Sequence, residues 1–144
     1  MIYYFDTSAL VKRYHREEGT EVVDKIIEGE SPIYFSTIAI AETISALRKL
    51  KSMRKISRKM YEKLVGVFFG EVEKRFVIVP LDDSQILTTI KMIEKHNLRT
   101  LDALHLAVAS EIKIMGDVIF VSSDKKLLLA AKKEGFGILN PEKP

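Results

Sequence analysis

The chain opens with MIYYFDTSALV (1–11), and this stretch decides the class of fold. Residues 2–5 (IYYF) form an uninterrupted apolar and aromatic run, which is typical of a strand that is buried on both faces. A carboxylate, Asp6, follows at once, and Thr7 or Ser8 can then cap a helix. Strands buried on both faces belong to parallel sheets that helices cover, so the opening favours an α/β fold.

The same alternation of strand and helix continues along the chain. Further strands are predicted at 33–36, 76–81, 118–122 and 136–139. Helices are predicted at 7–14, 19–29, 37–51, 58–75, 83–96, 101–115 and 124–134. We therefore expect a single domain over residues 1–144. Its expected fold class is α/β, a three-layer sandwich in which a parallel sheet of four or five strands is flanked by helices.

Composition excludes several kinds of site. The 144 residues include no Cys, which rules out disulfides, thiolate metal sites and Cys nucleophiles. A Ser-His-Asp spacing, a Walker loop and a GxGxxG fingerprint are also missing, so serine hydrolases, P-loop enzymes and dehydrogenases lack support. No apolar run approaches the roughly 20 residues of a membrane span. No basic leader precedes the first strand, so we expect no signal peptide and a cytoplasmic location.

Four carboxylates stand alone in stretches that carry no other charge. They are Asp6 in 1–11, Glu42 in 31–47, Asp102 in 100–110 and Asp124 in 118–124. The predicted topology brings all four towards the edge where the parallel strands end. Oxygen ligands suit Mg²⁺ or Mn²⁺, so we predict a shared divalent metal. Without metal, we expect the carboxylates to converge within a few Å and their repulsion to raise at least one pKa.

Each of these acids also has a structural explanation. Asp6 and Asp124 can cap helices, and Asp102 can favour the dipole of a first helical turn. Glu42 is harder to explain in this way, because apolar residues share its helix face.

Other polar residues are assigned structural or surface positions. Asp82 and Asp83 form an ordinary helix start. His105 is expected to pack in the core face of its helix with a satisfied ring nitrogen rather than to face the site. His15 and His96 lie near predicted helix ends and are expected to be exposed.

Positive charge is concentrated in one segment. Residues 48–59 (RKLKSMRKISRK) contain seven Lys or Arg and no acid, whereas acids exceed bases over the rest of the chain. Such a segment indicates a contact with a polyanion, although a solvated helix face is the alternative. The candidate RNA-binding residues are Lys12, Arg13, Arg16, Arg54, Lys55, Arg58 and Lys59.

Four motifs together resemble a known family. FDTSALVKRY (5–14), AE (41–42), LRTLDALHLA (98–107) and VSSDKKLL (121–128) are similar to the PIN-domain nucleases, and above all to the VapC-type toxins of toxin–antitoxin pairs. The resemblance covers nearly the whole chain and implies a PIN-like topology and a metal-dependent ribonuclease. It carries the family's acidic quartet onto the four carboxylates above, as catalytic and metal-binding residues. It also implies supporting roles for Ser8 and Ser122.

Residues and resemblance together predict a Mg²⁺- or Mn²⁺-dependent endoribonuclease, the toxin of a toxin–antitoxin pair. Its predicted partners are RNA, a small antitoxin protein and a second copy of the chain. The homodimer is also expected because the helices over 37–75 carry more apolar residues than one core can cover: Leu47, Leu50, Met53, Ile56, Val67, Phe68 and Phe69. The alternatives are a PIN-like module that binds nucleic acid without cutting it, and a metal-dependent phosphatase.

Overall fold

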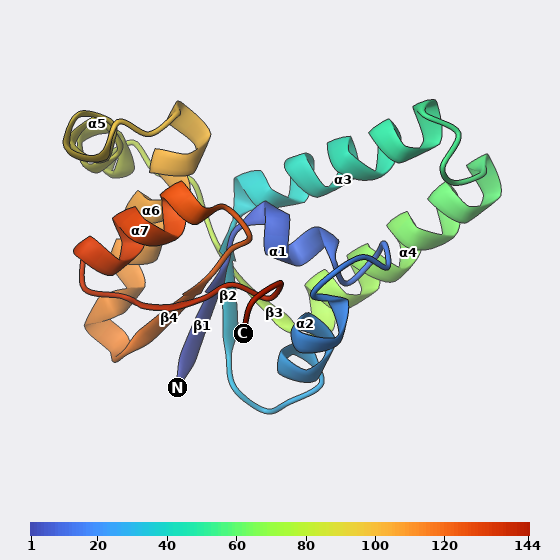
Figure 1. Ribbon diagram of the computed structural model, residues 1–144, viewed down its shortest axis with the longest axis horizontal. Coiled ribbons are helices and arrows are strands. Elements are labelled where there is room, and N and C mark those ends of the chain that lie inside the picture. Colours follow the sequence, from blue (N-terminus) through green and yellow to red (C-terminus); the bar gives the residue numbers. More distant parts are fainter.

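The computed structural model describes residues 1–144 and confirms the α/β class. Five parallel strands form one sheet in the order β3-β2-β1-β4-β5, so the first strand lies at its centre (Figure 1). The strands are β1 (Ile2–Phe5), β2 (Ile33–Ser36), β3 (Phe76–Val79), β4 (Val118–Val121) and β5 (Gly137–Leu139). All five predicted strands are present, each within two residues of its expected bounds.

Helices cover both faces of this sheet and make the predicted three layers (Figure 1). One face is covered by α1 (Thr7–Val11), α2 (Thr20–Ile27), α3 (Thr37–Ser52) and α4 (Arg58–Lys74). The other is covered by α5 (Ser84–His96), α6 (Thr100–Ile112), which a 3₁₀ turn (Lys113–Met115) extends, and α7 (Lys125–Lys133). Neighbouring residues of β1 point to opposite faces, so Tyr4 and Phe5 enter different cores and are both fully buried.

The helix starts show where local chemistry follows the sequence pattern and where it departs from it. Ser36 and Ser57 cap α3 and α4 as expected. The cap of α1 is Asp6 rather than Thr7 or Ser8, because the extended backbone continues through Asp6 and its carboxylate accepts the Ala9 amide. The Asp6 carboxylate, which follows the central strand, is therefore held by a hydrogen bond from the first turn of α1.

Helices α3 and α4 form a long hairpin that extends beyond the sheet (Figure 1). The basic tip, residues 48–59, comprises the end of α3, the connecting loop and the start of α4. Its four RNA-binding candidates, Arg54, Lys55, Arg58 and Lys59, are all exposed. About 15 Å of helix separate Glu42 from the end of α3, since each residue adds about 1.5 Å. The basic tip is thus remote from the predicted site.

None of the helices combines the length and the apolar character that crossing a membrane requires.

Candidate functional site

Asp6 is a buried carboxylate at the carboxyl end of the central strand. Only 4% of the residue is exposed. Ser8 Oγ donates to its Oδ1 at 2.7 Å and the Ala9 amide donates to the same atom at 3.1 Å. Ser122 Oγ donates to Oδ2 at 2.7 Å. Burial raises the pKa of Asp6, although the charge of His105 and these three hydrogen bonds act to lower it.

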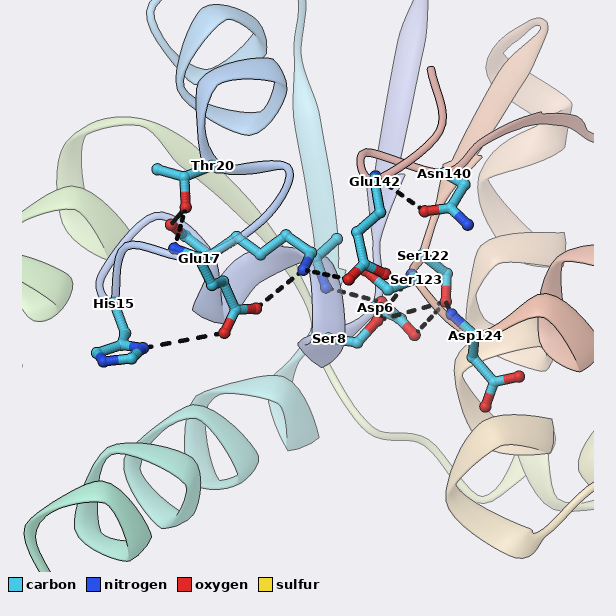
Figure 2. A network of polar contacts seen from close by, with 12 residues as sticks. Asp6, Ser8, His15, Glu17, Thr20, Ser122, Ser123, Asp124, Asn140 and Glu142 are labelled. Carbon is cyan, nitrogen blue, oxygen red and sulfur yellow. Dashed lines mark hydrogen bonds and ion pairs between the residues drawn. The ribbon is translucent and has the colours of Figure 1, made fainter. Parts of the chain in front are cut away.

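The two predicted supporting hydroxyls tie the end of β1 to the end of β4 (Figure 2). Ser122 is fully buried, and its Oγ also accepts the amide of Asp124 at 3.0 Å. Ser8 Oγ accepts the amide of Ser123 at 3.0 Å. Each hydroxyl therefore donates its hydrogen to Asp6 and accepts a backbone amide from the segment that follows β4. The two serines hold the Asp6 carboxylate in one orientation.

Glu42 lies on α3 and is held by two donors. Thr7 Oγ1 donates to its Oε1 at 2.7 Å, and His105 Nε2 lies 2.6 Å from the same oxygen. Burial acts to raise the pKa of Glu42, but the hydrogen bond and charge of His105, with the Thr7 hydroxyl, outweigh it and the pKa is lowered. Since Thr7 directly follows Asp6, this bond brings the second acid to the end of the central strand.

The side chains of the other two acids have their own partners. Asp102 lies in the first turn of α6 and accepts from Arg99 Nε at 3.2 Å. Asp124 caps α7, where its Oδ1 accepts the Leu127 amide at 3.0 Å. In Figure 2 the Asp124 carboxylate points away from Asp6. The structural roles foreseen for Asp6, Asp102 and Asp124 are thus all present.

The expected convergence of the four carboxylates on a common point is not seen. No three His, Asp or Glu side chains are placed to hold one ion between them. The expected cause of the pKa shift was also wrong. Burial is the largest cause of the raised pKa of Asp6, and none of the other three carboxylates is among its main causes. The functional roles of the four residues remain predictions.

Four of the basic candidates already bind carboxylates: Lys12, Arg13, Arg16 and, at the exposed basic tip, Arg58, whose Nε lies 3.2 Å from Glu62 Oε1. Lys12 is 3% exposed, and its ammonium lies 2.9 Å from Glu17 and 3.6 Å from Glu142. A phosphate could reach this ammonium only by displacing these partners, so contact of Lys12 with RNA stays an untested prediction. Arg13 is engaged by three acids, which raise its pKa through hydrogen bonds led by Glu71.

Arg16 is different, because its side chain is 75% exposed and pairs only with Glu21. Among the candidates, Arg16 and the residues of the basic tip are the ones accessible to a nucleic acid.

Sequence reasoning missed two residues of the site. His105 is buried, as expected, but its ring reaches Glu42 instead of serving the core alone. The available signal was its spacing of three residues from Asp102, which places both on one face of α6. Thr7 was considered only as a helix cap, and nothing in the sequence links it to Glu42.

The prediction that His96 is exposed was wrong. Its side chain is 4% exposed rather than free in solvent, because its Nε2 lies 2.7 Å from Glu134 Oε2.

Relatives support the resemblance stated from the motifs. The PIN domain family model matches residues 3–133. Ribonuclease VapC46 of Mycobacterium tuberculosis (strain ATCC 25618 / H37Rv) is 30% identical over 140 residues, which cover 96% of each chain.

Solved structures share the fold. The structure of FitAB bound to an IR36 DNA fragment has a TM-score of 0.71 at 18% identity and covers 100% of this chain and 97% of that one. A toxin–antitoxin complex from Klebsiella pneumoniae has a TM-score of 0.68 at 14% identity, with 99% of both chains covered. The family model spans most of the sequence and its motifs lie at the edge described above, so the chain belongs to the PIN-domain family.

Proposed function

We propose that this chain is a divalent-metal-dependent endoribonuclease that hydrolyses RNA phosphodiester bonds, and that it is the toxin of a toxin–antitoxin pair. The observation that carries the proposal is Asp6. It is a buried carboxylate at the edge where α/β sheets place their ligands, and it is bound by two hydroxyls and one amide but by no cation. The 30% identical relative is a ribonuclease, and the structural neighbours include toxin–antitoxin complexes, which supports both parts of the proposal.

The donor chemistry of the site fits Mg²⁺ or Mn²⁺. Both are hard cations that prefer oxygen ligands, and a cation would compensate the burial of the Asp6 charge. Asp102 can change partner at little cost, since a surface ion pair such as that with Arg99 contributes about 0–1 kcal/mol. The Arg99 side chain is 85% exposed. The ion would be held by the four predicted carboxylates after the side chains of Asp102 and Asp124 rotate.

The residues of the chain would divide the work of hydrolysis. A bound divalent ion supplies an activated water and neutralises the charge of the phosphate. Ser8 and Ser122 fix the Asp6 carboxylate, one hydroxyl on each oxygen. Once Asp102 turns to the ion, the exposed Arg99 becomes free to contact an RNA phosphate. Arg16 and the basic tip would bind the RNA backbone at a distance from the cut.

Exposed apolar residues support self-association, both within the helices over 37–75, where they were expected, and at a second surface. Leu47 and Phe68 are fully buried and so cannot form an interface, whereas Val67 and Phe69 are each 46% exposed on α4. A second apolar face is exposed on α5 and beside it, formed by Leu81, Ile86, Leu87, Ile90 and Leu101. Contiguous apolar surface of this kind marks protein interfaces. We propose a homodimer through one of these two faces.

A small antitoxin is the other proposed partner, and the cytoplasm the proposed location. A partner's Arg that reached Asp6 and Glu42 would satisfy their charges and exclude the metal, because a guanidinium binds carboxylates bidentately.

Cleavage assays separate this proposal from its two alternatives. The purified chain is incubated with single-stranded RNA, and in parallel with an aryl phosphate, in Mg²⁺, Mn²⁺ or EDTA. The proposal predicts internal RNA cuts only with metal. RNA binding without cuts would favour the non-cleaving module, and turnover of the aryl phosphate alone would favour a phosphatase.

A further inference from the structure

Both ring nitrogens of His105 have partners at the edge of the site. The residue lies on α6 and is 2% exposed. Its Nδ1 lies 3.0 Å from the Tyr4 hydroxyl, and its Nε2 lies 2.6 Å from Glu42 Oε1. Tyr4 belongs to the central strand β1 and Glu42 to α3. The imidazole therefore links α6 to β1 and α3, beside Glu42.

The partners determine which ring nitrogen carries the hydrogen. A carboxylate only accepts, so Nε2 donates to Glu42. Tyr4 is fully buried, and its hydroxyl hydrogen needs an acceptor, which the Nδ1 lone pair provides. The neutral form of His105 is thus held as the Nε2–H tautomer.

A second donor reaches the same oxygen of Glu42. Thr7 Oγ1 donates to Oε1 at 2.7 Å, so both donors bind one carboxylate oxygen and neither binds Oε2. Thr7 is the neighbour of Asp6, and the bond therefore fixes Glu42 relative to the buried acid. Carboxylates that bind metals are commonly held by hydrogen bonds from outer partners, and here those bonds leave Oε2 without a donor.

We propose that His105 is a positioning residue that, held in one tautomer by Tyr4, fixes Glu42 through Oε1 and keeps Oε2 available to a divalent cation. The inference rests on the proposed function, since it names the residue that prepares one acid of that site. His105 touches neither RNA nor the reacting atoms and acts only through Glu42. Losing such an outer partner weakens metal binding by roughly 10- to 100-fold.

The chain offers a matched control for this histidine. The side chain of His96 is also buried, and its Nε2 lies 2.7 Å from Glu134 Oε2. That pair joins the C-terminal ends of α5 and α7, whereas Asp124 caps the opposite end of α7. Replacing either histidine breaks a partly buried His–Glu pair, but only His105 faces the site. A loss of stability alone would therefore appear in both variants.

The test compares four variants of the full chain: His105→Leu, His105→Gln, Tyr4→Phe and His96→Leu. Mn²⁺ affinity is measured by titration calorimetry on metal-free protein, and RNA cleavage is divided into kcat and KM. We expect His105→Leu to weaken Mn²⁺ binding roughly 10- to 100-fold and to lower kcat more than it raises KM. His105→Gln should recover part of the affinity, because its amide can donate to Glu42. His96→Leu should bind Mn²⁺ as the wild type does.

Nitrogen NMR of the imidazole in the metal-free wild type gives a readout that is independent of activity. The spectrum should show the Nε2–H tautomer, and Tyr4→Phe should shift the Nδ1 signal and weaken Mn²⁺ binding less than His105→Leu does. If His105→Leu fails to fold, the Mn²⁺ affinity of Tyr4→Phe and the spectrum of the wild type test the inference in its place. An Nδ1–H tautomer, or a His105→Leu variant with wild-type Mn²⁺ affinity, overturns the inference alone. A wild-type chain that binds no Mn²⁺ and cuts no RNA overturns the proposed function and the inference with it.

Discussion

Replacing Ser122 by Ala should destabilise the protein strongly, because its buried hydroxyl makes two hydrogen bonds. One goes to the Asp6 carboxylate at 2.7 Å and the other comes from the Asp124 amide at 3.0 Å. A bond to a charged group contributes about 1.5–3 kcal/mol and a neutral one about 0.5–1.5 kcal/mol. We therefore expect Ser122→Ala to lower the free energy of unfolding by about 2–4 kcal/mol, a large share of the roughly 5–15 kcal/mol of a typical domain.

The neighbouring residue supplies the control for this change. Ser123 Oγ is also buried, but it has no hydrogen-bond partner. Ser123→Ala also removes a buried hydroxyl, but one without a partner. It should change the free energy of unfolding by no more than about 0.5 kcal/mol, or stabilise the fold. Urea unfolding followed by circular dichroism in EDTA should show a midpoint about 1–2 M lower for Ser122→Ala only. Equal midpoints for the two variants would refute the assigned role of Ser122, and Ser122→Thr, which keeps the hydroxyl, should unfold near the wild type.

Three further predictions concern charge and association. Burial raises the folded pKa of Asp6 above its ordinary value of 3.8. The metal-free wild type should therefore lose stability relative to Asp6→Asn as the pH rises from 3.8 through the raised pKa. Parallel pH profiles of the two proteins in thermal unfolding would contradict this. Replacing the four exposed candidates of the basic tip by Gln should weaken RNA binding and reduce its salt slope, whereas an unchanged slope would show that the tip does not bind RNA. Light scattering of Leu87→Lys and Phe69→Lys should identify the dimer face, because only the variant in the interface becomes monomeric, and a monomeric wild type would exclude the dimer.

The strands could be predicted well because their signal is local. Residues 2–5 and 33–36 have the bounds that uninterrupted apolar runs indicate. The cap of α1 could not be decided from the sequence, because Asp6, Thr7 and Ser8 are all good capping residues and the choice depends on where the extended backbone ends.

Side-chain partners could not be predicted, because they come from distant parts of the sequence. The contact of His105 with Glu42 joins residues 63 positions apart, and the bond of Ser122 to Asp6 joins residues 116 positions apart. Lys12 was proposed as an RNA contact from its charge alone, and one of its two carboxylate partners, Glu142, lies at the other end of the chain. The topology indicates which edge the four acids share, but the directions of the Asp102 and Asp124 side chains depend on local partners that composition does not reveal.

The central claim is that Asp6 is the core of a metal-dependent site that cuts RNA. Its most direct test is the single-turnover rate of RNA cleavage in Mn²⁺ for the wild type, Asp6→Asn and the control Asp117→Asn. Asp117 is an exposed acid just before β4, at the opposite edge of the sheet. We predict that Asp6→Asn lowers the rate by at least about 100-fold, the upper end of the loss from an outer-shell partner, while remaining folded, and that Asp117→Asn cuts at the wild-type rate. Wild-type cleavage by Asp6→Asn would contradict the account.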